Sequence, residues 1–434
     1  MNRTENLERE LTAWFMDTAA PRTPDYTDDI VRLTAGLAQR PRWAFPERWF
    51  PMSVITLARR TVSPVPWRTV GVLAVIALLI AAMLAVYIGS RPNVPPPFGF
   101  AANGMLALGD NGPSGDAGDI VVVDPATGRT ITLIGGPTDD SYPTYSHDGT
   151  RIVFNRNVVG GAELFVIDAG GKGAPIQLTK PDSVGVYGLV WSPDDKQIAY
   201  TNDNLVIGAA DGSGAKTNDL AVGVAYPTWR PPRGGDIAFI GSSDADSTKN
   251  GFYLVQSDGS NLRPILKPDG KLLDGGPVQF TPDGGRIVTT VPDVAGSGSQ
   301  TARVHVVAVG DDGRVTSDEP IGPVVLSVTF GYPISPDGTR VVAAIREPAG
   351  SGWRLGIISL DDSAPVVLTG PVFDATFAAE NTFAVAWSPD GSMITVNDGV
   401  RHEVWLLDAA GGKHQRAGWF DPSAEPTMWQ RLAP

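Results

Sequence analysis

A short phrase recurs along the chain and constrains its fold more than any other feature. It consists of an aromatic or apolar residue followed by Ser or Thr, Pro, Asp and Gly. Its copies are YSHDG (145–149), WSPDD (191–195), FTPDG (280–284), ISPDG (334–338) and WSPDG (387–391), with a diverged copy WRPPRGGD (229–236) and an incomplete one, WQRLAP (429–434). The Asp positions lie 46, 89, 54 and 53 residues apart, and the second gap covers two repeats. A period of about 40–50 residues predicts a β-propeller.

Each copy continues with two further strand patterns. An apolar strand follows the turn, as in RIVF (151–154), and an alternating strand then ends in a Gly-rich turn, as in ELFVIDAGG (163–171). Such alternation with turn signals is typical of hairpins. In the recurring phrase Pro presets φ, Asp bonds its own backbone and Gly accepts the left-handed conformation. The turn aspartates are therefore interpreted as turn formers rather than metal ligands.

The residue ahead of each turn is expected to pack between neighbouring sheets, with ligand stacking as the alternative role. The aromatic residues in this position are Tyr145, Trp191, Trp229, Phe280, Trp387 and Trp429.

These repeats resemble the TolB-type, WD40-like propeller repeats of bacterial cell-envelope proteins. The resemblance covers about 335 residues, more than three quarters of the chain. It implies an all-β propeller, a fold that serves as a binding scaffold, as a gate on peptidases and, in some cases, as an enzyme. TolB itself is a soluble periplasmic protein of an envelope complex, whereas this chain has an apolar segment that predicts a membrane anchor.

The two ends of the repeat region are incomplete in complementary ways. Residues 103–134 supply a second, third and fourth strand, whereas the C-terminal PTMWQRL (426–432) supplies a first strand with nothing after it. We expect them to complete one blade together and close the ring. Together with six full repeats, this predicts seven blades; six, the usual number for the TolB type, is the alternative.

A long apolar segment precedes the repeats. No charged residue occurs from Thr69 to Ser90, and as a helix these 22 residues would span about 33 Å, enough to cross a bilayer. Six arginines lie between positions 40 and 68, but only Arg91 closely follows the segment. The positive-inside rule therefore predicts a cytoplasmic N-terminus and an extracytoplasmic C-terminal part.

The predicted membrane span and the repeats divide the chain into four parts. We expect a cytoplasmic helical and juxtamembrane segment at 1–66, a single transmembrane helix at 67–90, a Pro-rich linker at 91–99 and the propeller at 100–434. Four prolines in the linker favour an extended, stiff spacer.

The composition argues against a catalytic, metal or cofactor site and against nucleic-acid binding. The chain has no Cys, its four His residues are scattered, and no G-x-S-x-G motif occurs. We therefore expect no catalytic, metal or cofactor site and no enzymatic activity. A net charge of −13 and a pI near 4.8 also argue against a nucleic-acid partner.

The second turns of the blades are long and variable, and they are expected on one face, opposite the tight first and third turns. Because long loops often contain the residues that recognise a partner, this face, over the mouth of the central channel, is the candidate binding surface. The alternative is that these are solvated loops whose sequences have drifted without a function. Its candidate residues are Asp110, Asp116, Arg156, Asp244, Asp246, Lys249, Asp293, Arg346, Glu347, Trp353, Arg401 and His402.

Three functions are compatible with this organisation. The favoured one is a membrane-anchored extracytoplasmic scaffold that binds a protein or ligand of the cell envelope. The first alternative is a transmembrane sensor that signals through residues 1–60 to a cytoplasmic partner. The second is an enzyme built within the propeller. In each case residues 67–90 are expected to contact membrane lipid.

Overall fold

The computed structural model describes residues 10, 12–13, 71–80, 98–110, 118–159, 161–179, 187–232, 234–292, 302–328, 330–346, 352–373, 383–398, 401, 403–418 and 427–432. The chain divides into two compact units, Met1–Tyr87 and Ile88–Pro434.

In the first unit, residues 71–80 form a helix whose apolar side chains are exposed, Leu78 by 71%. Within the ranges given above, no helix is both long and apolar enough to cross a membrane. The rest of the predicted span, residues 91–97 of the linker and nearly all of 1–66 lie outside the described residues.

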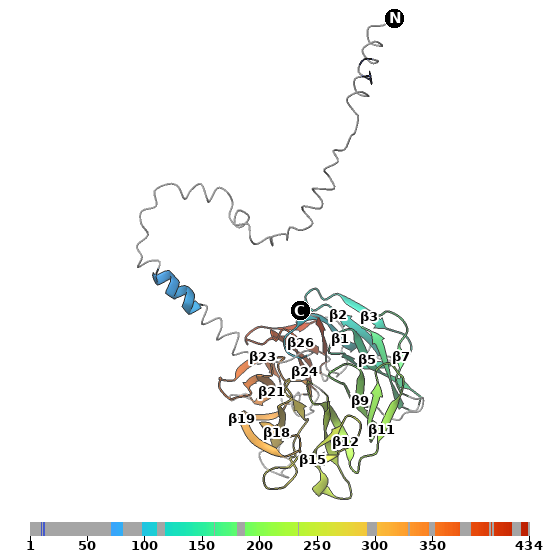
Figure 1. The fold of residues 1–434 in the computed structure, drawn as a ribbon, viewed down its shortest axis with the longest axis vertical. Helices are drawn as coiled ribbons and strands as arrows, with labels where there is room; N and C mark the ends of the chain where they lie inside the picture. Colours follow the sequence, from blue (N-terminus) through green and yellow to red (C-terminus); the bar gives the residue numbers. More distant parts are fainter. Residues whose placement is uncertain are drawn as a thin grey trace, which may run out of the picture. The chain divides into compact units, whose positions relative to one another are not determined.

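The second unit consists of β-strands grouped into sheets (Figure 1). The first sheet contains β1 (Ala102–Asp110), β2 (Asp119–Val123), β3 (Thr130–Ile134) and β28 (Met428–Leu432). The second contains β4 (Asp140–Tyr145), β5 (Arg151–Val158), β6 (Gly161–Asp168) and β7 (Ile176–Gln177). The third contains β8 (Tyr187–Trp191), β9 (Gln197–Thr201), β10 (Leu205–Ala209) and β11 (Ala215–Asn218).

The remaining strands form three sheets. The fourth contains β12 (Gly223–Trp229), β13 (Asp236–Ser242), β14 (Gly251–Gln256) and β15 (Arg263–Pro264), with the 3-10 helix η3 (Ser247–Lys249) between β13 and β14. The fifth contains β16 (Gln279–Phe280), β17 (Arg286–Pro292), β18 (Ala302–Val309), β19 (Val315–Val328), β21 (Arg340–Arg346), β22 (Trp353–Ser359) and β23 (Val367–Phe373). The sixth contains β20 (Phe330–Tyr332), β24 (Phe383–Trp387), β25 (Met393–Asp398), β26 (Glu403–Asp408) and β27 (His414–Ala417).

The hydrophobic core lies between consecutive sheets. Ile120 of the first sheet and Ile152 of the second belong to one buried cluster. Leu106 of the first sheet packs with Leu406 of the sixth, so the two ends of the array meet; Figure 1 shows β1 and β26 close together. Each sheet is apolar on both faces because it has a neighbour on either side. The all-β, propeller-like fold expected from the repeats is confirmed.

The last strand closes the first sheet, as predicted. β28 pairs antiparallel with β1, with Trp429 opposite Leu106 and Met428 opposite Ala107. β1 in turn pairs with β2, and β2 with β3, so the N-terminal segment supplies the other three strands. The ring is therefore tied by strands from the two ends of the repeat region.

The sheet around β19 differs from the regular four-stranded pattern. β19 is 14 residues long, pairs with β18 along its first part, and then pairs with β21 through Val325 and Val328. β20 pairs in parallel with β24, the first long strand of the following repeat. The described strands consequently form six hydrogen-bonded sheets in which two repeats are fused, and the count of seven blades stays a prediction.

Candidate functional site

The recurring turns are tight because their own side chains hold them. In the third sheet, the Ser192 hydroxyl donates to Asp194 Oδ1 at 2.8 Å and accepts from the Gln197 N–H at 2.9 Å. The third turns use the same device. The hydroxyl of Ser359, and then the hydroxyl and N–H of Ser363, lower the pKa of Asp361 to about 2. These aspartates are turn formers, as the sequence indicated.

The first and third turns share one face, which we call the tight-turn face. Arg230, which precedes the first turn of the fourth sheet, donates to Asp311 of the next sheet's third turn at 2.9 Å. The same guanidinium donates from Nε to the carbonyl oxygen of Gly284, in that sheet's first turn, at 2.9 Å. The predicted sharing of a face is confirmed, and the second turns lie at the opposite strand ends, on what we call the long-loop face. The prediction that all second turns are long is wrong for the second sheet, because β5 and β6 continue the hairpin and only residues 159–160 join them.

The aromatic residue of each repeat joins neighbouring sheets. Trp191 Nε1 donates to the Thr144 carbonyl at 3.0 Å, and Trp387 Nε1 donates to the Pro333 carbonyl at 2.7 Å. Trp229 Nε1 makes the same bond to Val190 at 3.2 Å, so the diverged copy is a true repeat. All six predicted residues are at most 8% exposed, which supports the structural role over ligand stacking: Tyr145, Trp191, Trp229, Phe280, Trp387 and Trp429.

Arginines reinforce three of these junctions, a feature that the sequence analysis missed. The guanidinium carbon of Arg151 lies 4.8 Å from the Trp191 ring centroid, and Arg340 lies 4.6 Å from that of Trp387. Arg230 lies 5.7 Å from the ring of Phe280. Cation–π contacts of this kind are worth about 0.5–2 kcal/mol. For Arg151 and Arg340 the sequence signal is an Arg two residues after the turn Gly, whereas Arg230 directly follows Trp229; in all three cases the aromatic partner lies in the next repeat.

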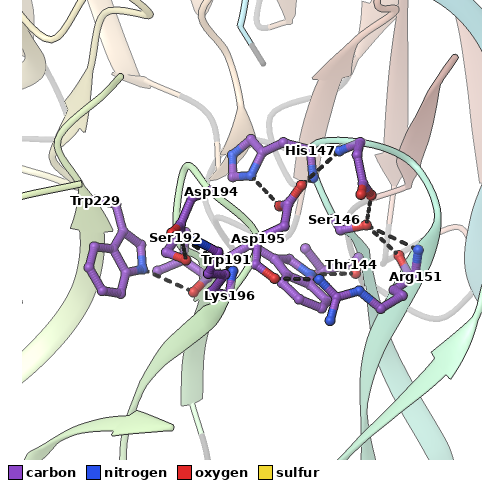
Figure 2. Close-up of polar contacts among 12 residues, drawn as sticks. Thr144, Ser146, His147, Arg151, Trp191, Ser192, Asp194, Asp195, Lys196 and Trp229 are labelled. Atoms are coloured by element: carbon purple, nitrogen blue, oxygen red, sulfur yellow. Dashed lines mark hydrogen bonds and ion pairs between the residues drawn. The ribbon is translucent and has the colours of Figure 1, made fainter. Parts of the chain in front are cut away.

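One junction uses a carboxylate (Figure 2). Asp195 stands where the other copies have Gly and adopts φ +57°. Its Oδ1 accepts from the His147 N–H at 2.8 Å and lies 2.9 Å from His147 Nδ1, while its Oδ2 accepts from the Asp148 N–H at 2.9 Å. At the matching Gly284 a Cβ would collide with the Pro231 carbonyl, because neighbouring turns come close there. At this close approach the Asp195 carboxylate instead accepts hydrogen bonds from the first turn of the second sheet.

On the long-loop face, two predicted arginines are tied to buried carboxylates. Arg156 donates to both oxygens of Asp140, from Nε at 2.7 Å and from Nη2 at 3.0 Å. Arg401 Nη1 donates to Asp398 Oδ2 at 2.8 Å. Both aspartate side chains are completely buried, so each needs its arginine to offset the loss of hydration. These two arginines serve the fold, which the sequence analysis did not anticipate.

The β13–β14 loop carries three of the candidate charges, of which Asp244 and Lys249 are exposed and Asp246 is half-buried. Asp246 caps η3 by accepting from the Thr248 N–H at 3.1 Å, and its Oδ2 lies 4.0 Å from Lys249 Nζ. Asp244 precedes this cap and is exposed. Because the cap fixes the short helix, the loop has a defined shape as well as charge.

The other candidates have different surroundings. The Arg346 guanidinium lies 5.9 Å from the Trp353 ring centroid, but Trp353 is only 9% exposed and presents no free ring. Asp110, at the end of β1, lies opposite Asp119 of β2. Four further candidates lie outside the described residues: Asp116, Asp293, Glu347 and His402. Across the part of the chain that is described, no group of three or more His, Asp or Glu residues could hold a metal ion.

Comparisons with known proteins agree with this architecture. No protein-family model matches the chain. A curated relative, Protein TolB homolog of Chlorobaculum tepidum, is 32% identical over 128 residues, which are 28% of this chain and 28% of the relative's length. The chain thus matches little more than a quarter of that relative.

Solved structures show the same fold at low identity. A functionally unknown protein from Desulfotomaculum acetoxidans has a TM-score of 0.51 at 12% identity, covering 76% of this chain and 100% of that protein. An oligogalacturonate lyase from Vibrio parahaemolyticus has a TM-score of 0.50 at 15% identity, covering 73% of this chain and 86% of the lyase. The repeats, the closed first sheet and these likenesses lead to one conclusion: the repeat-bearing part of this chain has a β-propeller fold, and part of its sequence is similar to a TolB homolog.

Proposed function

We propose that this protein is a non-enzymatic scaffold, anchored in the membrane by residues 67–90, whose seven-bladed propeller lies outside the cytoplasm. Its long-loop face binds a protein or ligand of the cell envelope. The TolB-type repeats support an envelope role, and the arginine asymmetry around the apolar segment supports the orientation. The seven-blade count is supported by β21–β23, which follow their own S-P-D-G turn although β19 joins them to the preceding repeat.

The observation that carries the proposal is the contrast between the tight-turn face and the β13–β14 loop of the long-loop face. On the tight-turn face, side chains such as Arg230 and Asp195 are engaged in holding adjacent sheets together. On the long-loop face, the side chains of Asp244, Asp246 and Lys249 on the capped β13–β14 loop reach solvent and have no bond to another sheet among the described residues. Exposed charges on a loop of defined shape are suited to steering and recognising a partner.

Paired charge reversals test the choice of face. One variant carries Asp244→Lys and Lys249→Glu; its matched control carries Asp211→Lys and Lys172→Glu, at exposed positions on the tight-turn face. A photo-crosslinking residue at position 243 first identifies the partner in intact cells, and the affinity of the purified partner is then measured. We expect weaker binding only for the first variant. Equal loss with both variants, or loss only with the control, would refute the assignment.

A further inference from the structure

Both ends of the propeller lie on its tight-turn face, because strand order requires it. In a complete repeat the strand after the S-P-D-G turn, such as β5, runs from the tight-turn face to the long-loop face. β1 occupies the same place in its sheet, since its first-strand neighbour is β28. The chain must therefore enter β1 from the tight-turn face, and β28 must end there.

Contacts from three separate turns or strands fix the residues just ahead of β1. The ring of Phe98 lies edge-on against the imidazole of His147, with a centroid distance of 4.9 Å. The Gly99 carbonyl accepts from Arg431 Nη2 at 2.8 Å, and the Ala101 N–H donates to the Pro389 carbonyl at 2.9 Å. His147 belongs to the first turn of the second sheet, Arg431 to β28, and Pro389 to the first turn of the sixth sheet.

These contacts occur where the chain passes from the Pro-rich segment into the propeller. Gly99 is buried, and the Asp390 N–H donates to the side-chain oxygen of Asn103, the second residue of β1, at 3.0 Å. The incoming chain is thus held across the junction between the sixth, first and second sheets. Loss of one of these bonds would leave the others to keep it on the same face.

We propose that the propeller is tethered by its tight-turn face, so that the long-loop face is directed away from the membrane, towards a partner that is not embedded in it. This inference rests on the proposed function, because it requires the apolar segment to be the anchor. The two faces are separated by the strand length, and the eight residues of β5 alone span about 26 Å. A partner on the long-loop face would therefore meet the protein well above the lipid surface.

The cysteine-free chain allows a direct test with single labels. Lys172→Cys and Asp211→Cys place a donor dye on the tight-turn face, and Asp244→Cys and Val159→Cys place it on the long-loop face; all four positions are exposed. The full-length protein is reconstituted into phosphatidylglycerol–phosphatidylcholine vesicles that contain a headgroup-linked acceptor dye. Energy transfer to the acceptor reports how near each label lies to the lipid surface.

We expect severalfold more transfer from both tight-turn labels than from both long-loop labels. Equal transfer from the two pairs, or more transfer from the long-loop pair, would overturn the tether assignment even when the protein is anchored. Flotation of the same vesicles on a density gradient checks the anchor separately, and a chain that does not float would overturn the proposed anchoring. Thermal unfolding of each variant, matched to the wild type, confirms that the label leaves the fold intact.

Discussion

Truncating one side chain of the closing strand tests how the ring is held. Trp429 is 5% exposed and belongs to the buried cluster that contains Leu106 of the first sheet and Leu406 of the sixth. Replacing a buried Trp by Ala costs about 3–5 kcal/mol, since apolar contacts are lost and a cavity remains. An unfolding entropy of about 2.1 cal/mol/K per residue gives roughly 0.7 kcal/mol/K for about 335 residues. Trp429→Ala should therefore lower the Tm by about 4–7 °C.

The substitutions Trp387→Phe and Trp429→Phe separate the effect of packing from that of hydrogen bonding, because both residues hold the same position in their repeats. Trp387 Nε1 donates to the Pro333 carbonyl and has Arg340 over its ring, whereas the buried Trp429 Nε1 has no hydrogen-bond partner among the described residues. Replacement by Phe removes similar volume at both positions, but only Trp387→Phe also removes a hydrogen bond. We therefore expect Trp387→Phe to cost about 1 kcal/mol more than Trp429→Phe.

The assay is thermal and urea unfolding of the full-length protein, followed by circular dichroism and Trp fluorescence. Leu432→Ala is the matched control, because Leu432 lies on the same strand but is 41% exposed and should change stability by less than about 0.5 kcal/mol. If Trp429→Ala leaves the Tm within about 1 °C of the wild type, the closing strand does not hold the ring and the reasoning is wrong.

Three further predictions follow from the same contacts. Asp195→Gly should destabilise the protein by about 1–3 kcal/mol in urea unfolding, because the N–H groups of His147 and Asp148 lose their acceptor; unchanged stability would show that the carboxylate is dispensable. Asp361 has its pKa lowered from 3.8 to about 2, so its contribution to stability is complete above about pH 3.8 and is lost as the pH falls towards 2. The urea midpoint should therefore fall between about pH 4 and 2, and less so in Asp361→Asn, whereas an equal fall in both would contradict this role. Protease added to intact spheroplasts should remove residues 100–434 and spare about the first 60, and protection of the propeller would refute the orientation.

The sequence by itself determined what depends on neighbouring residues. The turn Ser, Pro, Asp and Gly act within about five positions of one another, so their pattern gave the turns, the repeats and the face that first and third turns share. The incomplete blades at the two ends could also be paired in advance, because a missing first strand and a surplus first strand fit each other. The same reasoning located the aromatic residues between sheets, Trp191 and Trp387 among them.

Only the tertiary structure decided which distant groups meet. Arg156 and Arg401 were predicted to face a partner, but the fold buries Asp140 and Asp398 beside them, and a buried carboxylate requires a counter-charge. The continuation of β19 into a second repeat and the carboxylate bridge of Asp195 likewise depend on how two repeats dock. Local turn chemistry is encoded within a few residues, whereas these contacts depend on packing between segments that are tens of residues apart, and periodicity carries no information about such pairs.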